Sequence, residues 1–306
     1  EHFGNPALGL NDAFQPVSRY WDRITHPAQV LQSLPAALAT LLDPADCGPA
    51  FIALPQDVQG WTYDYPLSFF DRKIHRIRRQ TPDVREIQDA LKVLKDAKRP
   101  AIIAGGGVQY SKAVKELISF AEATNIPVIQ TIAGRANLLE DHKLNLGPVG
   151  VTGSESGNWV AERADVILSV GSRLQDFTTG SWTAFAVDAK FISLNTARHD
   201  ATKHMALSLV GDAKLGLKAL ENGIGQYQAP PGWTRDAQAQ RQKWDSYVLE
   251  NTKAGNRPNS YAQAIGIINA ICHPRDRIVA AAGGLPAEVT ANWRTLDIGT
   301  VDVEFG

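Results

Sequence analysis

The stretch AIIAGGG at residues 101–107 decides the fold class, because a short apolar run passes at once into three glycines. A helix signal precedes it: Thr81 offers a hydroxyl cap, Pro82 suits the first helical position, and Asp83 places an acid in the first turn. Apolar residues then recur at helical spacing between positions 84 and 94. Helix, strand and glycine turn begin an alternation that continues along the chain.

This alternation extends over residues 81–220. The sequence predicts a helix around residues 114–121, strands at 127–131, 166–170 and 191–194, and a helix at 153–163. Strands of four to six apolar residues separated by helices form a parallel sheet that is buried on both faces. We therefore predict an α/β fold, a doubly wound parallel-sheet domain flanked by incomplete α/β pieces.

The flanking regions are less regular. The first 75 residues contain one helix (about 27–42) and one buried strand (50–54), too little for a domain. Residues 222–232 are rich in Gly, Pro and Gln and indicate a linker, and the polar helix after it (234–249) has Trp244 and Tyr247 as its expected anchors. A last group follows: helix 260–271, strand 278–282, a glycine turn, helix 286–293 and strand 301–305. The expected segments are 1–75, 80–222, 223–258 and 259–306.

The composition is that of an ordinary globular protein. Of 306 residues 44% are hydrophobic, and 31 basic residues nearly cancel 32 acidic ones, so neither nucleic acid nor a membrane is indicated as a partner. No apolar run approaches the roughly 18 residues that span a bilayer, and no signal-like stretch opens the chain. Cys47 and Cys272 match no metal or disulfide spacing, which favours a reducing, cytoplasmic location.

Both ends of the chain are unusual. It starts at Glu1 without a methionine, and Met205 is its single methionine. It stops at Gly306, directly after the alternating run 301–305, which reads as a strand that needs neighbours. We therefore expect the chain to be a fragment.

Two patterns that could carry chemistry fall short of the full motif. Tyr110 stands where a dinucleotide fingerprint requires its third glycine, and the next strand ends at Gln130-Thr131 without the acid that would hold a ribose. The run GSESG at 153–157 has a glutamate where a nucleophile elbow has its serine. A tight turn and a helix start explain these segments more simply, although a pyrophosphate-bearing ligand at the glycine turn stays open.

The most suggestive local feature is Gly283-Gly284-Leu285-Pro286, where a strand ends and a helix begins. Two glycines let the backbone approach a ligand closely, and the amide groups at a helix start suit a diphosphate. A plain turn explains the same residues equally well, so both interpretations stay open at this point.

Several stretches resemble the thiamine-diphosphate-dependent enzymes, the family of acetolactate synthase. Residues 48–59, from GPA to LPQDVQ, resemble the strand that closes the pyrimidine-binding domain of that family. Residues 99–107 resemble the first strand of its central domain. Residues 164–180 are similar to the signature of the same domain, with ADV, GSRL and a final Thr-Gly.

Three further stretches resemble the branch of this family that acts in inositol breakdown. They are PVSRYWDRI at 16–24, YDYP with SFF within 63–70, and AAGGLP at 281–286. Together the resemblances cover essentially the whole chain. They imply hydrolytic carbon–carbon cleavage of a cyclic 1,2-diketone, a small-molecule substrate whose ring opens to a deoxy-glucuronate, with the cofactor doing the covalent work.

The resemblance implies a subunit with pyrimidine, central and diphosphate domains, which binds thiamine diphosphate and Mg²⁺ between the subunits of a homodimer or homotetramer. The catalytic glutamate of the family belongs upstream of Glu1, and its magnesium motif belongs downstream of Gly306. No catalytic and no metal-binding residue is therefore expected in this chain. Only Gly283, Gly284 and Leu285 are expected to contact the cofactor, at its diphosphate end, and the segment alone is expected to be inactive.

Other functions stay open. A 2-oxoacid carboligase of the acetolactate synthase type is one, although the stretches around Trp21 and Phe69 argue against it. A non-catalytic domain that binds a nucleotide or serves assembly is another, but the incomplete glycine pattern at Gly105 favours neither FAD nor NAD, and the missing ribose acid disfavours a dehydrogenase. Gly211-Asp212 precedes a helix and is not predicted to be a metal site.

Overall fold

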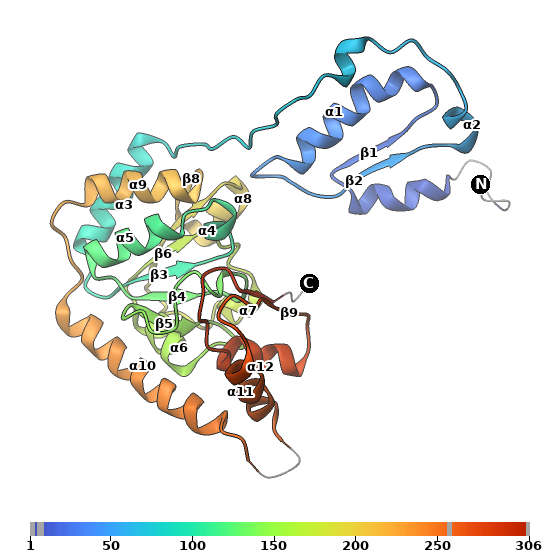
Figure 1. Ribbon diagram of the computed structural model, residues 1–306. Helices are drawn as coiled ribbons and strands as arrows, with labels where there is room; N and C mark the ends of the chain where they lie inside the picture. Colours follow the sequence, from blue (N-terminus) through green and yellow to red (C-terminus); the bar gives the residue numbers. More distant parts are fainter. Residues whose placement is uncertain (1–3, 5–8, 256–258, 304–306) are drawn as a thin grey trace. The chain divides into compact units, whose positions relative to one another are not determined.

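The computed structural model describes residue 4, residues 9–255 and residues 259–303, and Figure 1 labels its elements. The chain divides into two compact units, residues 1–79 and residues 80–306. The first unit contains a short two-stranded sheet, and the second contains a six-stranded sheet and a further two-stranded sheet.

Two parallel strands form the centre of the first unit. β1 (Tyr20–Arg23) pairs with β2 (Ala50–Ala53). The chain between them runs through η2 (Pro27–Gln29) and α1 (Val30–Leu41), which confirms the predicted helix and supplies the crossover that parallel neighbours need. The other elements of this unit are η1 (Leu10–Val17), α2 (Gln56–Gln59) and η3 (Leu67–Phe70).

The strand predicted at residues 50–54 is present, but the prediction that it is buried was wrong. Only Ala53 of β2 is buried, and Leu54 lies outside the strand with 54% of its surface exposed. A sheet of two strands covers too little of its own surface to bury a whole strand. Phe51 finds its partner instead in Phe14, whose ring stacks on it with the centroids 4.6 Å apart.

The six-stranded sheet of the second unit is parallel throughout (Figure 1). Its strand order is β5-β4-β3-β6-β7-β8, so the chain builds outward from β3 in one direction and then from β6 in the other. This reversal defines a doubly wound sheet, and the predicted fold class is confirmed. The strands are β3 (Pro100–Ala104), β4 (Val128–Gln130), β5 (Asn145–Pro148), β6 (Val166–Val170), β7 (Lys190–Asn195) and β8 (Leu207–Val210).

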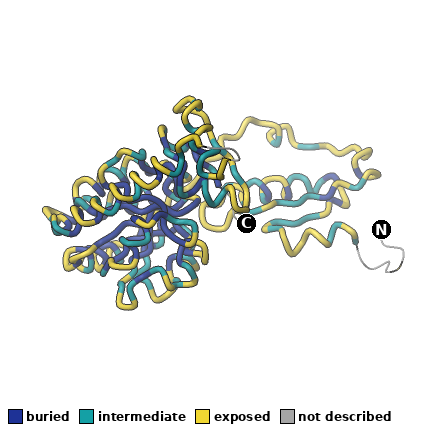
Figure 2. The backbone as a smooth tube through the Cα atoms, turned by 90° about the horizontal axis from the view of Figure 1, so that it is seen from below, coloured by how far each residue is buried: buried dark blue, intermediate teal, exposed yellow. Residues whose placement is uncertain are grey.

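Helices cover both faces of this sheet, with α3, α5 and α9 on one side and α6 and α10 on the other (Figure 1). The strands between them and the inward faces of the helices hold the buried residues of the unit, and Figure 2 draws buried residues dark blue. The helical elements are α3 (Val84–Asp96), α4 (Gly107–Tyr110), α5 (Val114–Thr124), η4 (Ile132–Gly134), α6 (Glu155–Arg163), α7 (Asp176–Thr179), α8 (Arg198–Ala201), η5 (Lys203–Met205), α9 (Ala213–Ile224) and α10 (Pro231–Asn251). No helix of the described residues is both long enough and apolar enough to span a bilayer.

The helix predicted to start with Thr81 begins later than expected. Its N-cap is Asp83, whose side chain accepts a hydrogen bond from the Arg85 amide at 2.8 Å. Pro82 packs instead against Gly211, where an added Cβ would lie 2.5 Å from the proline Cδ. The chain before α3 is therefore held by the loop that follows β8.

The three glycines after β3 serve close packing at the point where the strand order reverses. The amide of Gly107 donates to the carbonyl oxygen of Gly171, which follows β6, at 2.9 Å. A Cβ at Gly105 would lie 2.3 Å from the same oxygen, so only glycine fits there. The two loops thus pack backbone against backbone at the point where doubly wound sheets often bind ligands.

The segment predicted to be a linker is mostly helical or fastened to the sheet. α9 extends to Ile224 and α10 starts at Pro231, so only residues 225–230 are irregular. Within and beside them, Tyr227 Oη donates to the Ala97 carbonyl at 3.0 Å, and Trp233 Nε1 donates to the Pro100 carbonyl at 2.8 Å.

The predicted anchors of α10 were wrong. Trp244 is only partly buried, and Tyr247 is 56% exposed. The buried face of the helix carries other residues: Trp233, Thr234, Ala237, Arg241 and Val248. Trp233 is the effective anchor, since its ring also stacks on Trp159 of α6 with centroids 5.4 Å apart.

The last group of elements matches the prediction closely. α11 (Tyr261–Ile271), β9 (Ile278–Ala280), α12 (Gly284–Asn292) and β10 (Val301–Val303) follow in the expected order, and β9 and β10 are parallel. Residues 304 and 305 of the predicted closing strand lie outside the described residues. These elements pack on the loop after β4 through a small apolar cluster that includes Ala136 and Trp293.

Candidate cofactor site

The glycine turn predicted to approach a diphosphate lies between β9 and α12. Gly283 has φ +138°, a conformation that side-chain-bearing residues rarely adopt. The atom nearest to an added Cβ there would be Pro286 Cδ at 3.8 Å, so backbone conformation and not lack of space requires the glycine. α12 starts at the next residue, so the turn sits at the carboxyl end of a parallel strand, where α/β sheets bind ligands.

The start of α12 is open and uncapped. No side chain caps the helix at Gly283, and the first backbone bond within it runs from the Ala287 amide to the Gly283 carbonyl at 3.2 Å. The amides of Gly284 and Leu285 precede that first bond and therefore face out of the helix end. Gly283 and Gly284 are exposed, and Leu285 is 43% exposed. Exposed amides at the positive end of a helix dipole fit a diphosphate.

The other end of α12 is buried and bound to a side chain. Arg135, which follows η4, is fully buried, and its Nη2 donates a hydrogen bond of 2.7 Å to the carbonyl oxygen of Trp293, the C-cap of the helix. A cation at the C-terminus of a helix is favoured because it faces the negative end of the helix dipole. α12 therefore offers a positive, open end to solvent and a negative end to a buried arginine.

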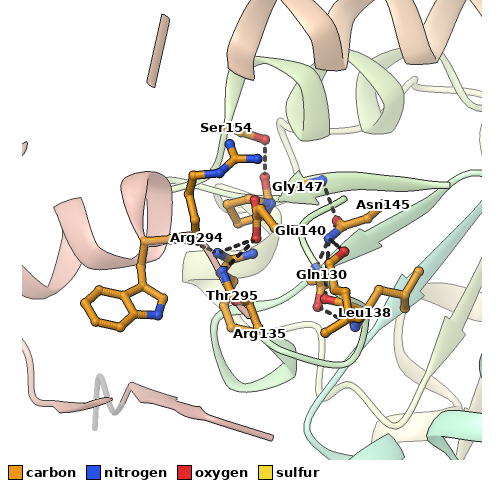
Figure 3. A network of polar contacts seen from close by, with 12 residues as sticks. Gln130, Arg135, Leu138, Glu140, Asn145, Gly147, Ser154, Arg294 and Thr295 are labelled. Carbon is orange, nitrogen blue, oxygen red and sulfur yellow. Dashed lines mark hydrogen bonds and ion pairs between the residues drawn. The ribbon is translucent and has the colours of Figure 1, made fainter. Parts of the chain in front are cut away.

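Arg135 belongs to a charge cluster that joins three segments of the second unit (Figure 3). Glu140 lies at its centre, 3.4 Å from Arg135 Nη2 and in hydrogen-bonded contact with Arg241 Nη2 on α10. Asp245, one turn along α10, accepts from Arg241 Nε at 3.1 Å and from Arg294 Nη1 at 3.0 Å. The charge cluster thus ties the loop after β4 and α10 to the residues that follow α12.

The charge cluster holds Glu140 ionised. Burial alone would raise the pKa of Glu140, but the charges of Arg135 and Arg241 outweigh it and lower that pKa to about 2. Burial likewise acts to lower the pKa of Arg241, and Glu140 and Asp245 reverse the effect and raise it. The carboxylate is therefore a structural anion at physiological pH and not a proton donor.

A second buried network includes Gln130, the position where a dinucleotide-binding strand would end in a ribose-binding acid. Gln130, the last residue of β4, donates through Nε2 to Asn145 Oδ1 at 3.0 Å and accepts from the Asn137 amide at 3.0 Å (Figure 3). Asn137 Nδ2 in turn donates to the Gly105 carbonyl at 3.0 Å. The side chain of Gln130 is thus used inside the protein, and it fastens the loop that carries Arg135.

The patterns judged incomplete in the sequence have structural roles. Ser154 is the N-cap of α6 and accepts from the Gly157 amide at 2.9 Å, so GSESG is a helix start. Asp212 caps α9 by accepting from the amides of Lys214 and Leu215. Among residues 9–255 and 259–303, no three His, Cys, Asp or Glu side chains gather as a metal site would require.

Sequence reasoning found the glycine turn but missed the charge cluster. Arg135 and Arg241 lie more than 100 residues apart in the chain, and nothing in the sequence pairs them. The spacing of Arg241 and Asp245 by one helical turn was the only visible signal.

Comparison with known proteins gives a family match for the six-stranded part of the chain. Residues 87–220 match the family model described as the central domain of thiamine pyrophosphate enzymes. Residues 87–220 are therefore similar to the central domain of thiamine pyrophosphate enzymes, in agreement with the predicted resemblance, and they run from α3 through the six-stranded sheet to α9.

Several curated proteins that are similar to the whole chain carry the same name. The chain is 36% identical over its full length to the 3D-(3,5/4)-trihydroxycyclohexane-1,2-dione hydrolase of Geobacillus thermodenitrificans (strain NG80-2), of which it covers 51%. It is 37% identical over 98% of its length to the protein of that name from Bacillus subtilis (strain 168), and 36% identical to that of Listeria monocytogenes serotype 4b (strain F2365). The chain spans about half the length of these relatives.

Proposed function

We propose that this chain is part of a thiamine-diphosphate-dependent enzyme that hydrolyses a carbon–carbon bond of a cyclic 1,2-diketone, a trihydroxycyclohexane-1,2-dione. The observation that carries the proposal is the identity of 36% along the whole chain to relatives named for that hydrolysis. In the reaction the bond between the two carbonyl carbons breaks and one water is consumed. One carbon becomes a carboxylate and the other an aldehyde, so the ring opens to a deoxy-glucuronate without net oxidation.

The chain contributes the diphosphate end of the cofactor site. We propose that the amides of Gly284 and Leu285 hold the diphosphate, and that Gly283 provides the backbone conformation that brings them to it. When bound, thiamine diphosphate supplies the carbanion that attacks a carbonyl carbon. The uncapped start of α12 and the exposure of the turn support this placement.

The domain organisation and assembly follow from the same proposal. Residues 1–75 would be the end of a pyrimidine domain, residues 80–222 the central domain, residues 223–258 a connection, and residues 259–306 the start of a diphosphate domain. We further propose a homodimer or homotetramer with Mg²⁺ at the diphosphate, acting in the cytoplasm. The magnesium ligands and the catalytic glutamate are proposed to come from outside this segment.

The test is a ring-opening assay on the intact gene product. The purified protein is incubated with thiamine diphosphate, Mg²⁺ and a trihydroxycyclohexane-1,2-dione, and the product is followed by mass spectrometry and NMR. The proposal expects a product heavier by one water, with new carboxylate and aldehyde signals that depend on the cofactor. Turnover of pyruvate with release of carbon dioxide, and none of the dione, would establish a carboligase instead.

A further inference from the structure

The two ends of α12 are held in different ways. Its N-terminal end is the exposed turn proposed to hold the diphosphate, and no side chain caps it. Its C-terminal end is fixed by the buried Arg135, which donates to the Trp293 carbonyl at 2.7 Å. The nine residues of the helix span about 13 Å, so Arg135 cannot touch a ligand at the glycine turn.

Arg135 is itself held by an ion pair. Its guanidinium is fully buried and pairs with Glu140, whose carboxylate also binds Arg241 and accepts from the Thr295 amide at 3.3 Å. The Glu140 amide donates to the Thr295 carbonyl at 3.2 Å, so the loop after β4 and the chain after α12 are joined from both sides.

A second attachment lies on α11. Asn269 accepts from the Arg294 amide at 2.9 Å and donates to the Arg294 carbonyl at 3.2 Å. The residue after Trp293 is therefore fixed to the neighbouring helix as well. A small rotation of α12 about this buried end would displace its open end, because a helix moves as a rigid rod.

We propose that Arg135 is a positioning residue for the cofactor, which it aligns through α12 without touching it. Arg135 influences the glycine turn in two ways. The hydrogen bond fixes the direction of the helix and so the aim of the Gly284 and Leu285 amides. The buried cation also stabilises the negative end of the helix dipole, while a bound diphosphate stabilises the positive end. The inference rests on the proposed function, since it assigns the diphosphate to that turn.

The experiment compares the cofactor affinity of Arg135→Met with that of a matched core variant in the intact gene product. Arg135→Met removes the donor and the charge, and Arg135→Lys keeps the charge and serves as the rescue. Leu117→Ala, in the fully buried core on α5, lowers stability without touching α12. Calorimetry measures the Kd for thiamine diphosphate in the presence of Mg²⁺, and hydrogen exchange follows the amides of residues 284–292.

We expect Arg135→Met to weaken cofactor binding by up to roughly tenfold, because α12 makes this bond with and without cofactor and only the part that aligns the turn is lost from binding. Arg135→Lys should recover part of this loss, and Leu117→Ala should stay within about twofold of the wild type. Exchange in α12 should accelerate in Arg135→Met and not in Leu117→Ala. Equal Kd values for Arg135→Met and the wild type, or an equal loss in Leu117→Ala, would overturn the inference.

The design separates the two proposals. If the wild type fails to bind thiamine diphosphate, the proposed function fails. The exchange measurement then decides alone whether Arg135 fixes α12: unchanged exchange in Arg135→Met contradicts that role. Should Arg135→Met not fold, Arg135→Lys carries both measurements, and affinity and exchange equal to the wild type would refute the need for the guanidinium.

Discussion

Glu140→Gln is the sharpest test of the charge cluster, because it removes one charge and almost no volume. The folded protein lowers the pKa of this carboxyl from its ordinary value of 4.5 to about 2. A tenfold change in an acidity constant is worth about 1.4 kcal/mol, so the ionised carboxylate stabilises the fold by about 3 kcal/mol at neutral pH. The side chain is only 10% exposed, so solvent screens little of this. The glutamine, like the protonated glutamate, leaves Arg135 and Arg241 without their shared anion, so the expected loss is about 3 kcal/mol.

The sign of the pH dependence follows from the lowered pKa. A carboxyl that is more acidic in the folded state stabilises fully above its unfolded value of about 4.5, and this contribution disappears as the pH falls to about 2. Urea unfolding followed by tryptophan fluorescence should give a large difference between wild type and Glu140→Gln at pH 7. The difference should shrink steadily below pH 4.5, because the protonated glutamate then resembles the glutamine.

The matched control is Glu162→Gln, the same substitution in an exposed pair with Arg163. Its carboxylate is 65% exposed, and such surface pairs contribute less than about 1 kcal/mol. A loss below 1 kcal/mol for Glu140→Gln at pH 7, or a difference from wild type that does not change between pH 7 and pH 3, would refute the account of the charge cluster.

Three further outcomes can be measured. Gly283→Ala should lower the free energy of unfolding by about 1–3 kcal/mol, because φ is +138° there, and should weaken cofactor binding. Gly284→Ala, whose added Cβ meets nothing closer than 3.5 Å, should retain wild-type stability. Equal urea midpoints for the two variants would contradict this. Gly105→Ala should lower the thermal midpoint sharply, since its Cβ would lie 2.3 Å from the Gly171 carbonyl oxygen, and an unchanged midpoint would show that the loops can separate. Burial raises the pKa of Tyr227 to about 12, so its contribution to stability is complete below about pH 10 and is lost as the pH rises towards 12. In an ultraviolet titration, Tyr227→Phe should lack one tyrosine that the wild type ionises near pH 12. If the tyrosine that is missing ionises near pH 10 in the wild type, the shift is disproved.

The sequence predicted the centre of the sheet better than its edges. Strands β3 and β6 are buried along their whole length, so they read as continuous apolar runs. β5 was not predicted, because Gly147 and Pro148 are unfavourable inside a strand and are tolerated here only at the edge of the sheet. β8, the opposite edge, is only partly buried and was not predicted either.

Part of the candidate site could likewise be predicted from the sequence and part could not. The turn at Gly283 could be predicted from the sequence because its positive φ requires a glycine at that position. The charge cluster could not be predicted, because its members come from segments that only the tertiary fold brings together. Arg135 in particular lies in a loop without periodicity, and its burial results from packing by residues around position 293.

The bonds that fasten residues 225–234 have a consequence for motion. The Ala229 amide donates to the Thr124 carbonyl at 2.7 Å, and the side chains of Tyr227, Trp233 and Thr234 bind three further backbone carbonyls. Although residues 225–230 have the composition of a linker, these hydrogen bonds fix them to the end of the sheet. They fix the start of α10 to the sheet as well. Any movement of residues 259–303 relative to the six-stranded sheet therefore needs a hinge outside residues 225–230.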